Sequence, residues 1–183
     1  DSTIGEAAPS APQAVFEMGL PVLGICYGMQ TMAAQLGGAV ESSNHREFGY
    51  AQIRARGHSE LLRDIEDHTT AEGWGMLDVW MSHGDKVTRF APGFKIVATS
   101  DGAPFAVIAD EERKYYGTQF HPEVVHTPDG ARLLENFTQK VAGCGGDWTM
   151  ASFKDQAIDA ARRQVGKGRV ICGLSGGVDS SVV

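Results

Sequence analysis

The stretch Pro21-Val-Leu-Gly-Ile-Cys-Tyr-Gly28 decides the fold that the sequence predicts. Residues 21–25 form a short apolar run, which is typical of a buried strand in an α/β sheet. Four apolar residues between Met29 and Leu36 then follow with the spacing of one helical face, and Gly37-Gly38 ends that helix. Cys26 is therefore predicted to lie between a buried strand and the N-terminus of a helix.

The segment Gly24-Ile-Cys-Tyr-Gly28 has the form of a nucleophile elbow with cysteine in place of serine. Gly24 and Gly28 supply the small neighbours that such a tight turn needs. The helix N-terminus favours the thiolate, so we expect a lowered pKa for Cys26. The main-chain N–H of Tyr27 can face an oxyanion. The alternative is a buried structural cysteine.

The tripeptide His121-Pro-Glu123 follows a strand predicted at 114–120. A cysteine nucleophile needs a base, and that base is oriented by a carboxylate. On an extended chain, His121 and Glu123 point to the same side. Alone, this tripeptide would more simply be a surface turn. Together with an elbow cysteine it predicts a Cys-His-Glu catalytic set.

Other elements complete a domain that we place at residues 1–142. Thr127 and Pro128 are expected to cap and begin a helix with a buried stripe of Leu133, Leu134, Phe137 and Val141. A short helix is expected at Gln13–Met18, and further strands at 48–56, 77–81, 95–100 and 105–110.

Residues 143–148 are glycine-rich and are predicted to link this domain to the start of a second one at 149–183. A helix with one apolar face, from Met150 to Val165, precedes an expected buried strand at 169–174. The turn Ser175-Gly-Gly-Val-Asp-Ser180 then leads into another helix. Such a turn can wrap main-chain N–H groups around phosphate, although it lacks the ending of a Walker A loop. An ordinary glycine turn is the alternative.

Composition excludes several classes of protein. The net charge of −7 offers no basic surface for nucleic acid or an anionic membrane. No apolar run approaches the roughly 18 residues of a membrane span, and no signal peptide is visible. The three cysteines have no paired or metal-like spacing, so we expect a reducing, cytoplasmic location and no metal site.

Gly24–Gln30, followed far downstream by Gln119–Glu123, resembles the signature pair of class I glutamine amidotransferases. The order Cys, His, Glu also differs from that of α/β-hydrolases. The resemblance implies that Cys26 attacks the side-chain amide of glutamine, forms a thioester and releases ammonia. His121 would be the acid and base, and Glu123 would orient it.

Two further stretches, Asn44–Gln52 and Asp78–Asp85, resemble segments of GMP synthases. This resemblance places Ser82 and Asp85 around the main-chain groups of glutamine, with Asp85 on the α-ammonium. Gln30 would hydrogen-bond the substrate. Without the resemblance, residues 82–85 would be a polar turn after a strand, in which His83 satisfies a local hydrogen bond.

The turn at 175–180 resembles the pyrophosphate loop of N-type ATP pyrophosphatases. Its expected ATP-binding residues are Ser175, Gly176, Gly177, Val178, Asp179 and Ser180. The expected fold is therefore α/β: an N-terminally truncated class I glutamine amidotransferase fold, followed by the first strand and helices of an adenine nucleotide α-hydrolase-like domain.

These resemblances together imply glutamine-dependent GMP synthesis. Xanthosine monophosphate (XMP) would be adenylylated by ATP with Mg²⁺ and then aminated by ammonia, without a prosthetic group, in a homodimer of the full-length enzyme. The family's glycine-rich oxyanion loop is expected upstream of Asp1. The alternatives are an amidotransferase that serves another acceptor, a γ-glutamyl cysteine hydrolase, and a catalytically silent regulatory module.

Overall fold

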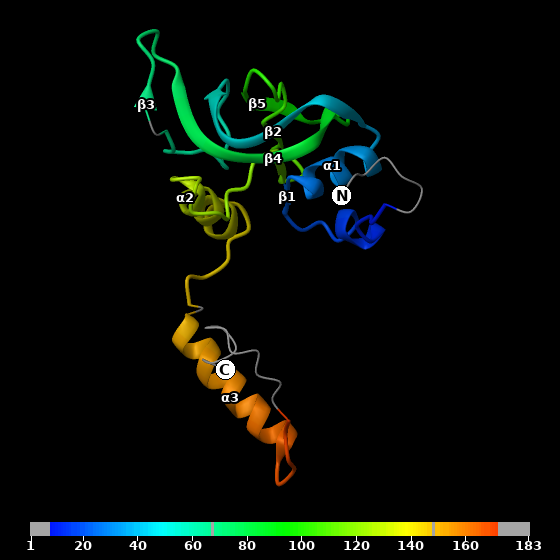
Figure 1. Cartoon of the computed structure of the whole chain (residues 1–183), viewed down its shortest axis with the longest axis vertical. Coiled ribbons are helices and arrows are strands. Elements are labelled where there is room, and N and C mark those ends of the chain that lie inside the picture. The colour runs from blue at the N-terminus through cyan, green and yellow to red at the C-terminus, as the bar shows by residue number, and fades with distance from the viewer. Residues whose placement is uncertain (1–7, 67, 148, 172–183) are drawn as a thin grey trace. The chain divides into compact units, whose positions relative to one another are not determined.

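The computed structural model describes residues 8–66, 68–147 and 149–171, and the chain divides into two compact units, Asp1–Cys144 and Gly145–Val183 (Figure 1). The division falls inside the stretch 143–148. Each unit is described by itself.

A mixed sheet forms the centre of the first unit. Within the described residues it has seven strands, in the order β1-β7-β6-β5-β2-β4-β3. Strands β1 and β7 are parallel, whereas the other neighbours are antiparallel. The bounds are β1 Val22–Ile25, β2 Ala39–Ala55, β3 His68–Thr69, β4 Gly75–Arg89, β5 Lys95–Thr99, β6 Val107–Asp110 and β7 Tyr115–Thr118.

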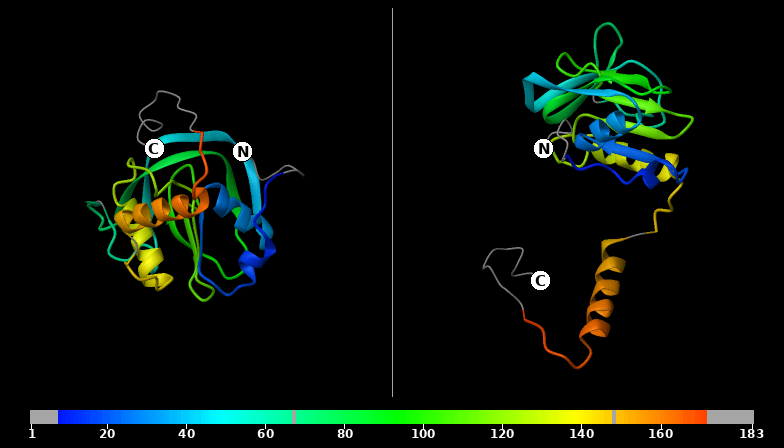
Figure 2. Two further views of the ribbon diagram at one scale, coloured as in Figure 1. Left: turned by 90° about the horizontal axis from the view of Figure 1, so that it is seen from below. Right: turned by 90° about the vertical axis from the view of Figure 1, so that its right-hand side faces the viewer.

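Helices cover both faces of the β1-β7-β6 part of the sheet. On β7, Tyr115 packs with Met29 and Met32 of helix α1 (Tyr27–Gln35). The next residue, Tyr116, points to the other face and belongs to a second cluster that contains Leu133 of α2 (Gly130–Glu135). This alternation is the two-residue period of a strand that is buried on both sides. Figure 2 shows α1 and α2 on either side of these strands.

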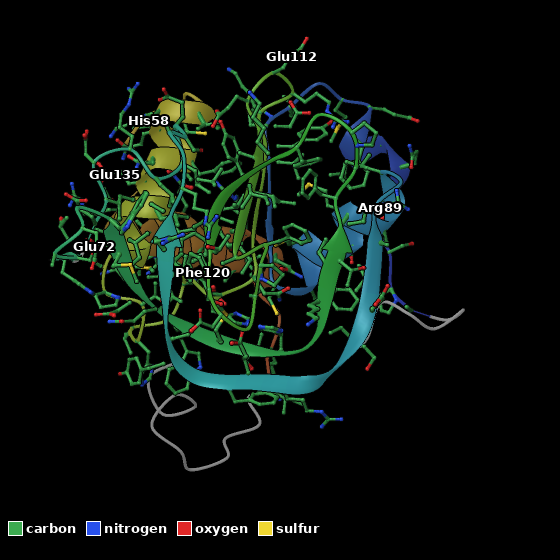
Figure 3. All side chains as sticks on the ribbon, turned by 90° about the horizontal axis from the view of Figure 1, so that it is seen from above. His58, Glu72, Arg89, Glu112, Phe120 and Glu135 are labelled. Atoms are coloured by element: carbon green, nitrogen blue, oxygen red, sulfur yellow. The ribbon has the colours of Figure 1, made fainter. Side chains whose placement is uncertain are left out.

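Strands β2 and β4 are much longer than the predicted segments 48–56 and 77–81. They pair from Ala39↔Arg89 to Arg54↔Met76, with irregularities between Ala39 and Val40 and between Ser42 and Glu47. Figure 3 shows the two strands bending around the part of the interior that contains Phe120. The sequence does not predict the first half of β2, because residues 41–46 are all polar. The long antiparallel pairing with β4 keeps this segment in a strand against its local propensity.

The helix predicted from Thr127 begins later, at Gly130, and its N-cap residue is Asp129. The Thr127 hydroxyl donates to the main-chain oxygen of His121 and so does not cap the helix. After Glu135 the helix continues as a π-helix, η2 (Asn136–Val141). The predicted stripe does face the core. The strands predicted at 21–25, 95–100, 105–110 and 114–120 are confirmed with shorter ends. The helix predicted at 13–18 is a 3-10 helix, η1 (Gln13–Phe16).

The second unit contains α3 (Met150–Val165), which ends at Gly166 with a φ of 55°, as its sequence predicts. The expected strand at 169–174 is not seen in its described part, and the side chains of Val170 and Ile171 are 71% and 99% exposed. A strand of a sheet needs a neighbouring strand to pair with, and the described residues of this unit contain no strand. None of the helices in the described ranges has the length and apolarity needed to cross a membrane.

Candidate active site

The parallel pair β1 and β7 brings the predicted cysteine and histidine to one edge of the sheet. Ile25 is opposite Thr118, and the Cys26 N–H donates to the Thr118 oxygen over 2.7 Å. Cys26 follows β1, and the segment Gln119–His121 follows β7. Because the carboxyl ends of parallel strands meet at the same edge, Cys26 and Gln119 become neighbours although they are 93 positions apart in the sequence.

The main chain at Cys26 has φ 49° and ψ −103°, a conformation that residues with a side chain rarely adopt. It is the strained turn of a nucleophile elbow. A Cβ atom on Gly24 would lie 2.7 Å from the main-chain carbon of Gly28 and nitrogen of Met29, so only glycine fits. Gly28 differs from the prediction, because a Cβ there would meet nothing within 4 Å. Gly24 alone is sterically required.

The thiol of Cys26 is half-buried between two contacts of opposite chemical character. Its Sγ lies 3.6 Å from the main-chain oxygen of Ser82, to which the S–H donates. The Nε2 of Gln119 donates to Sγ over 3.8 Å.

Burial raises the pKa of the Cys26 thiol above its ordinary value. The Tyr27 main-chain N–H opposes this, the Glu123 carboxylate adds to it, and Gln119 opposes it again. The expectation of a lowered pKa is therefore wrong for this structure, because desolvation outweighs the N–H groups of the helix N-terminus.

His121 and Glu123 form the predicted pair, with His121 Nδ1 2.6 Å from Glu123 Oε1. Their side chains are 25% and 47% exposed, so this pair faces the solvent side of the site. The bond to Nδ1 fixes the imidazole ring and leaves Nε2 as its other functional atom.

The main chain of His121 is held at both of its polar atoms. Its N–H donates to the Trp80 oxygen over 3.0 Å, and its oxygen accepts from the Thr127 hydroxyl over 2.7 Å. The same hydroxyl accepts from the Trp80 N–H over 3.1 Å. Nearby, a Cβ on Gly130 would collide with the main chain of Pro122, so the start of α2 lies directly against this segment. Thr127 and Gly130 therefore fix the position of the histidine.

Ser82, His83 and Asp85 lie within β4, which rules out the polar turn after a strand. The Nδ1 atom of the buried His83 lies 3.1 Å from the main-chain oxygen of Asp85, and its Nε2 lies 3.0 Å from Glu47 Oε2. His83 therefore links β4 to β2. Asp85 Oδ2 is buried without a hydrogen-bond partner, and among the described side chains only Thr31 Oγ1 shares that state. A buried carboxylate oxygen without a partner is costly, which suits an atom that a ligand ammonium group would satisfy.

Gln30 is 3% exposed and its amide nitrogen bonds the protein. Its Nε2 donates to the main-chain oxygen of Asp85 over 2.8 Å and to Gln119 Oε1 over 3.4 Å. Because the amide nitrogen of Gln30 is already bonded, a substrate would have to contact its amide oxygen, and this contact stays a prediction.

The pyrophosphate-like segment 175–180 lies outside the described residues. Within those described, no group of three or more His, Cys, Asp or Glu side chains is arranged to hold a metal ion.

The sequence alone did not reveal the contacts of Gln119 and Thr127. Gln119 stands two residues before His121, but its contact with Cys26 depends on strand pairing that no local pattern reveals.

Residues 2–141 match the family model described as glutamine amidotransferase class-I. The chain belongs to the class I glutamine amidotransferase family. The crystal structure of a Thermoplasma acidophilum protein, assigned as part of a GMP synthase, has a similar fold. Its TM-score is 0.62 at 25% identity, covering 85% of this chain and 65% of that one.

Within this amidotransferase family, the similar curated proteins include glutamine-hydrolysing GMP synthases of two bacteria. The Alkalilimnicola ehrlichii protein is 62% identical over 183 residues, and the Aromatoleum aromaticum protein is 65% identical over 173 residues. These alignments cover 100% and 94% of this chain but only 35% and 33% of the relatives. The chain thus spans about a third of the length of the proteins that it matches.

Proposed function

We propose that Cys26, His121 and Glu123 form the catalytic triad of a glutaminase whose ammonia serves GMP synthesis. The observation that carries this proposal is the strained elbow at Cys26, placed beside the segment that holds the bonded pair His121 and Glu123. A buried structural cysteine has no need of a positive φ, which costs about 1–3 kcal/mol and persists mainly at functional sites.

In the proposed mechanism, His121 takes the proton of the Cys26 thiol, and the sulfur attacks the carboxamide carbon of glutamine. The raised pKa of Cys26 means that the thiol keeps its proton until this transfer. The Tyr27 N–H, next to the nucleophile at the start of α1, would be one donor to the oxyanion. When the C–N bond breaks, His121 returns the proton to the leaving nitrogen, which departs as ammonia.

The resulting γ-glutamyl thioester is then hydrolysed. His121 takes a proton from water, and the water oxygen attacks the thioester carbon. The C–S bond then breaks to give glutamate, and His121 returns the proton to the sulfur, which restores the thiol. Glu123 orients the imidazole and stabilises its charged form throughout.

Substrate recognition in this proposal falls to β4. Asp85 Oδ2, buried without a partner, would receive the α-ammonium group of glutamine, and Ser82 lies beside the thiol. Ammonium to carboxylate is a charge-assisted bond, stronger than a neutral one.

The ammonia acceptor is proposed from the relatives. Proteins named as glutamine-hydrolysing GMP synthases align with this chain from end to end, including the segment beyond residue 141. The full-length protein would therefore adenylylate XMP with ATP and Mg²⁺, the expected ATP contacts being at 175–180, and ammonia would displace AMP to give GMP. This alignment favours GMP synthesis over another acceptor or a plain γ-glutamyl hydrolase.

A direct assay of the full-length protein tests this function. With XMP, ATP and Mg²⁺ present, we expect glutamate and GMP to form in equal amounts from glutamine, as measured by chromatography. Asparagine, which is one methylene shorter, should support neither product. Glutamate formation without GMP under these conditions would favour the plain hydrolase instead.

A further inference from the structure

The amide of Gln119 is fixed in direction by a chain of hydrogen bonds. The main-chain oxygen of Asp85 can only accept, so the Gln30 atom 2.8 Å away must be Nε2. The same nitrogen lies 3.4 Å from the Gln119 amide, which must therefore present its oxygen to Gln30. The nitrogen of Gln119 is then the atom that faces Cys26 Sγ, at 3.8 Å.

Gln119 is also rigidly placed. It is 1% exposed, and its main-chain N–H donates to the Ala106 oxygen over 2.9 Å. Burial of a side chain that can donate and accept is costly unless its hydrogen bonds are made. The amide is therefore held between Gln30 on one side and the sulfur on the other.

The two polar contacts of the sulfur favour different protonation states. The Ser82 oxygen can only accept, so it stabilises the thiol through its S–H. An amide N–H can only donate, so the Gln119 contact is strongest when the sulfur is a thiolate. The negative charge of the Glu123 carboxylate, in the segment after β7, disfavours the thiolate. Gln119 is therefore the side chain that counters burial and Glu123.

We propose that Gln119 is a positioning residue for the nucleophile: its amide N–H holds Sγ of Cys26 and stabilises the thiolate, and Gln30 fixes the direction of that amide. The inference rests on the glutaminase function proposed above. It adds to the triad a side chain that does not itself exchange protons with the substrate.

The test follows the thiol of Cys26 itself in the full-length protein. The rate of alkylation by iodoacetamide is measured across pH by mass spectrometry of the Cys26 peptide, with the exposed Cys144 as internal reference. In Gln119→Met the donor is lost at similar volume. We expect the Cys26 midpoint to move up by about half to one pH unit, with alkylation about three- to tenfold slower below the midpoint.

Gln119→Glu keeps the shape but replaces the donor by an acceptor, so its midpoint should rise further. The matched control is Gln52→Met, which removes an exposed glutamine amide bonded to Asp78 and should leave the Cys26 midpoint unchanged. An unfolded variant is recognised because Cys26 would then titrate together with Cys144.

Glutaminase assays on the same variants separate this inference from the proposed function. We expect kcat/KM for glutamine to fall by about three- to tenfold in the Gln119 variants, because the thiolate that forms when His121 takes the proton loses its donor. Unchanged midpoints in both folded Gln119 variants would overturn the positioning role, even if glutamine is hydrolysed. Shifted midpoints in a protein that does not hydrolyse glutamine would support the role and overturn the glutaminase proposal.

Discussion

Replacing Cys26 with alanine in the full-length protein is expected to abolish GMP formation from glutamine and to leave GMP formation from ammonium salts intact. The alanine variant has no atom that can form the thioester, so no ammonia is released from glutamine. Adenylylated XMP needs only a free amine, which added ammonium supplies. We expect a loss of at least about 10³-fold in the glutamine-dependent rate, since covalent catalysis is removed entirely.

The measurement is GMP formed from XMP and ATP with each nitrogen donor in turn. Retained activity with ammonium shows that the variant is folded, which matters because alanine must also adopt the positive φ at this position. Cys144→Ala, at an exposed cysteine, is the matched control and should behave as the parent. If a folded Cys26→Ala protein also failed with ammonium, Cys26 would have a role in the synthetase step.

Replacing His121 with alanine should cost about 10²–10⁴-fold in glutaminase rate, because proton transfer to and from the reacting groups is lost. Glu123→Gln should be milder, by roughly one to two orders of magnitude. Its side chain is 47% exposed, so water can take part of its place, and the glutamine oxygen can still accept from Nδ1. Glutamate release under saturating glutamine measures both variants.

The exposed His58, on the loop after β2, offers a matched histidine control, and His58→Ala should leave the glutaminase rate unchanged. Thermal unfolding of each variant shows whether the fold is kept. A His121→Ala protein as active as the parent would remove His121 from the mechanism. Equal losses in Glu123→Gln and His121→Ala would show that the carboxylate is as necessary as the ring.

The sequence was sufficient to predict the β1–α1 turn because its signal is local. A short apolar run, a glycine before Cys26 and a helical apolar stripe all lie within 16 residues, Pro21–Leu36. The structure places Cys26 and the segment that carries His121 after neighbouring parallel strands, as such a site requires. The local pattern also predicts that glycine is needed at position 28, which the structure does not support. A Cβ on Gly28 would face open space, whereas a Cβ on Gly24 would meet main-chain atoms.

What the sequence could not predict depends on contacts between distant segments. Ser82–Asp85 looks like a turn but is held in β4 by pairing with β2. Thr127 has the properties of a helix cap, yet its hydroxyl is used by His121 and Trp80. The pKa of Cys26 was predicted from the helix N-terminus alone, and the burial that outweighs it follows only from tertiary packing.

The central claim, that Cys26 is the nucleophile of a glutamine-hydrolysing site, is tested most directly by affinity labelling. The full-length protein is treated with a diazo-ketone analogue of glutamine, and the modified peptide is identified by mass spectrometry. Because the analogue must first occupy the glutamine site, we predict one adduct, on Cys26, whose formation excess glutamine suppresses and which is absent in Cys26→Ala. Labelling of Cys144 to the same extent, or labelling of Cys26 that glutamine does not suppress, would contradict the assignment.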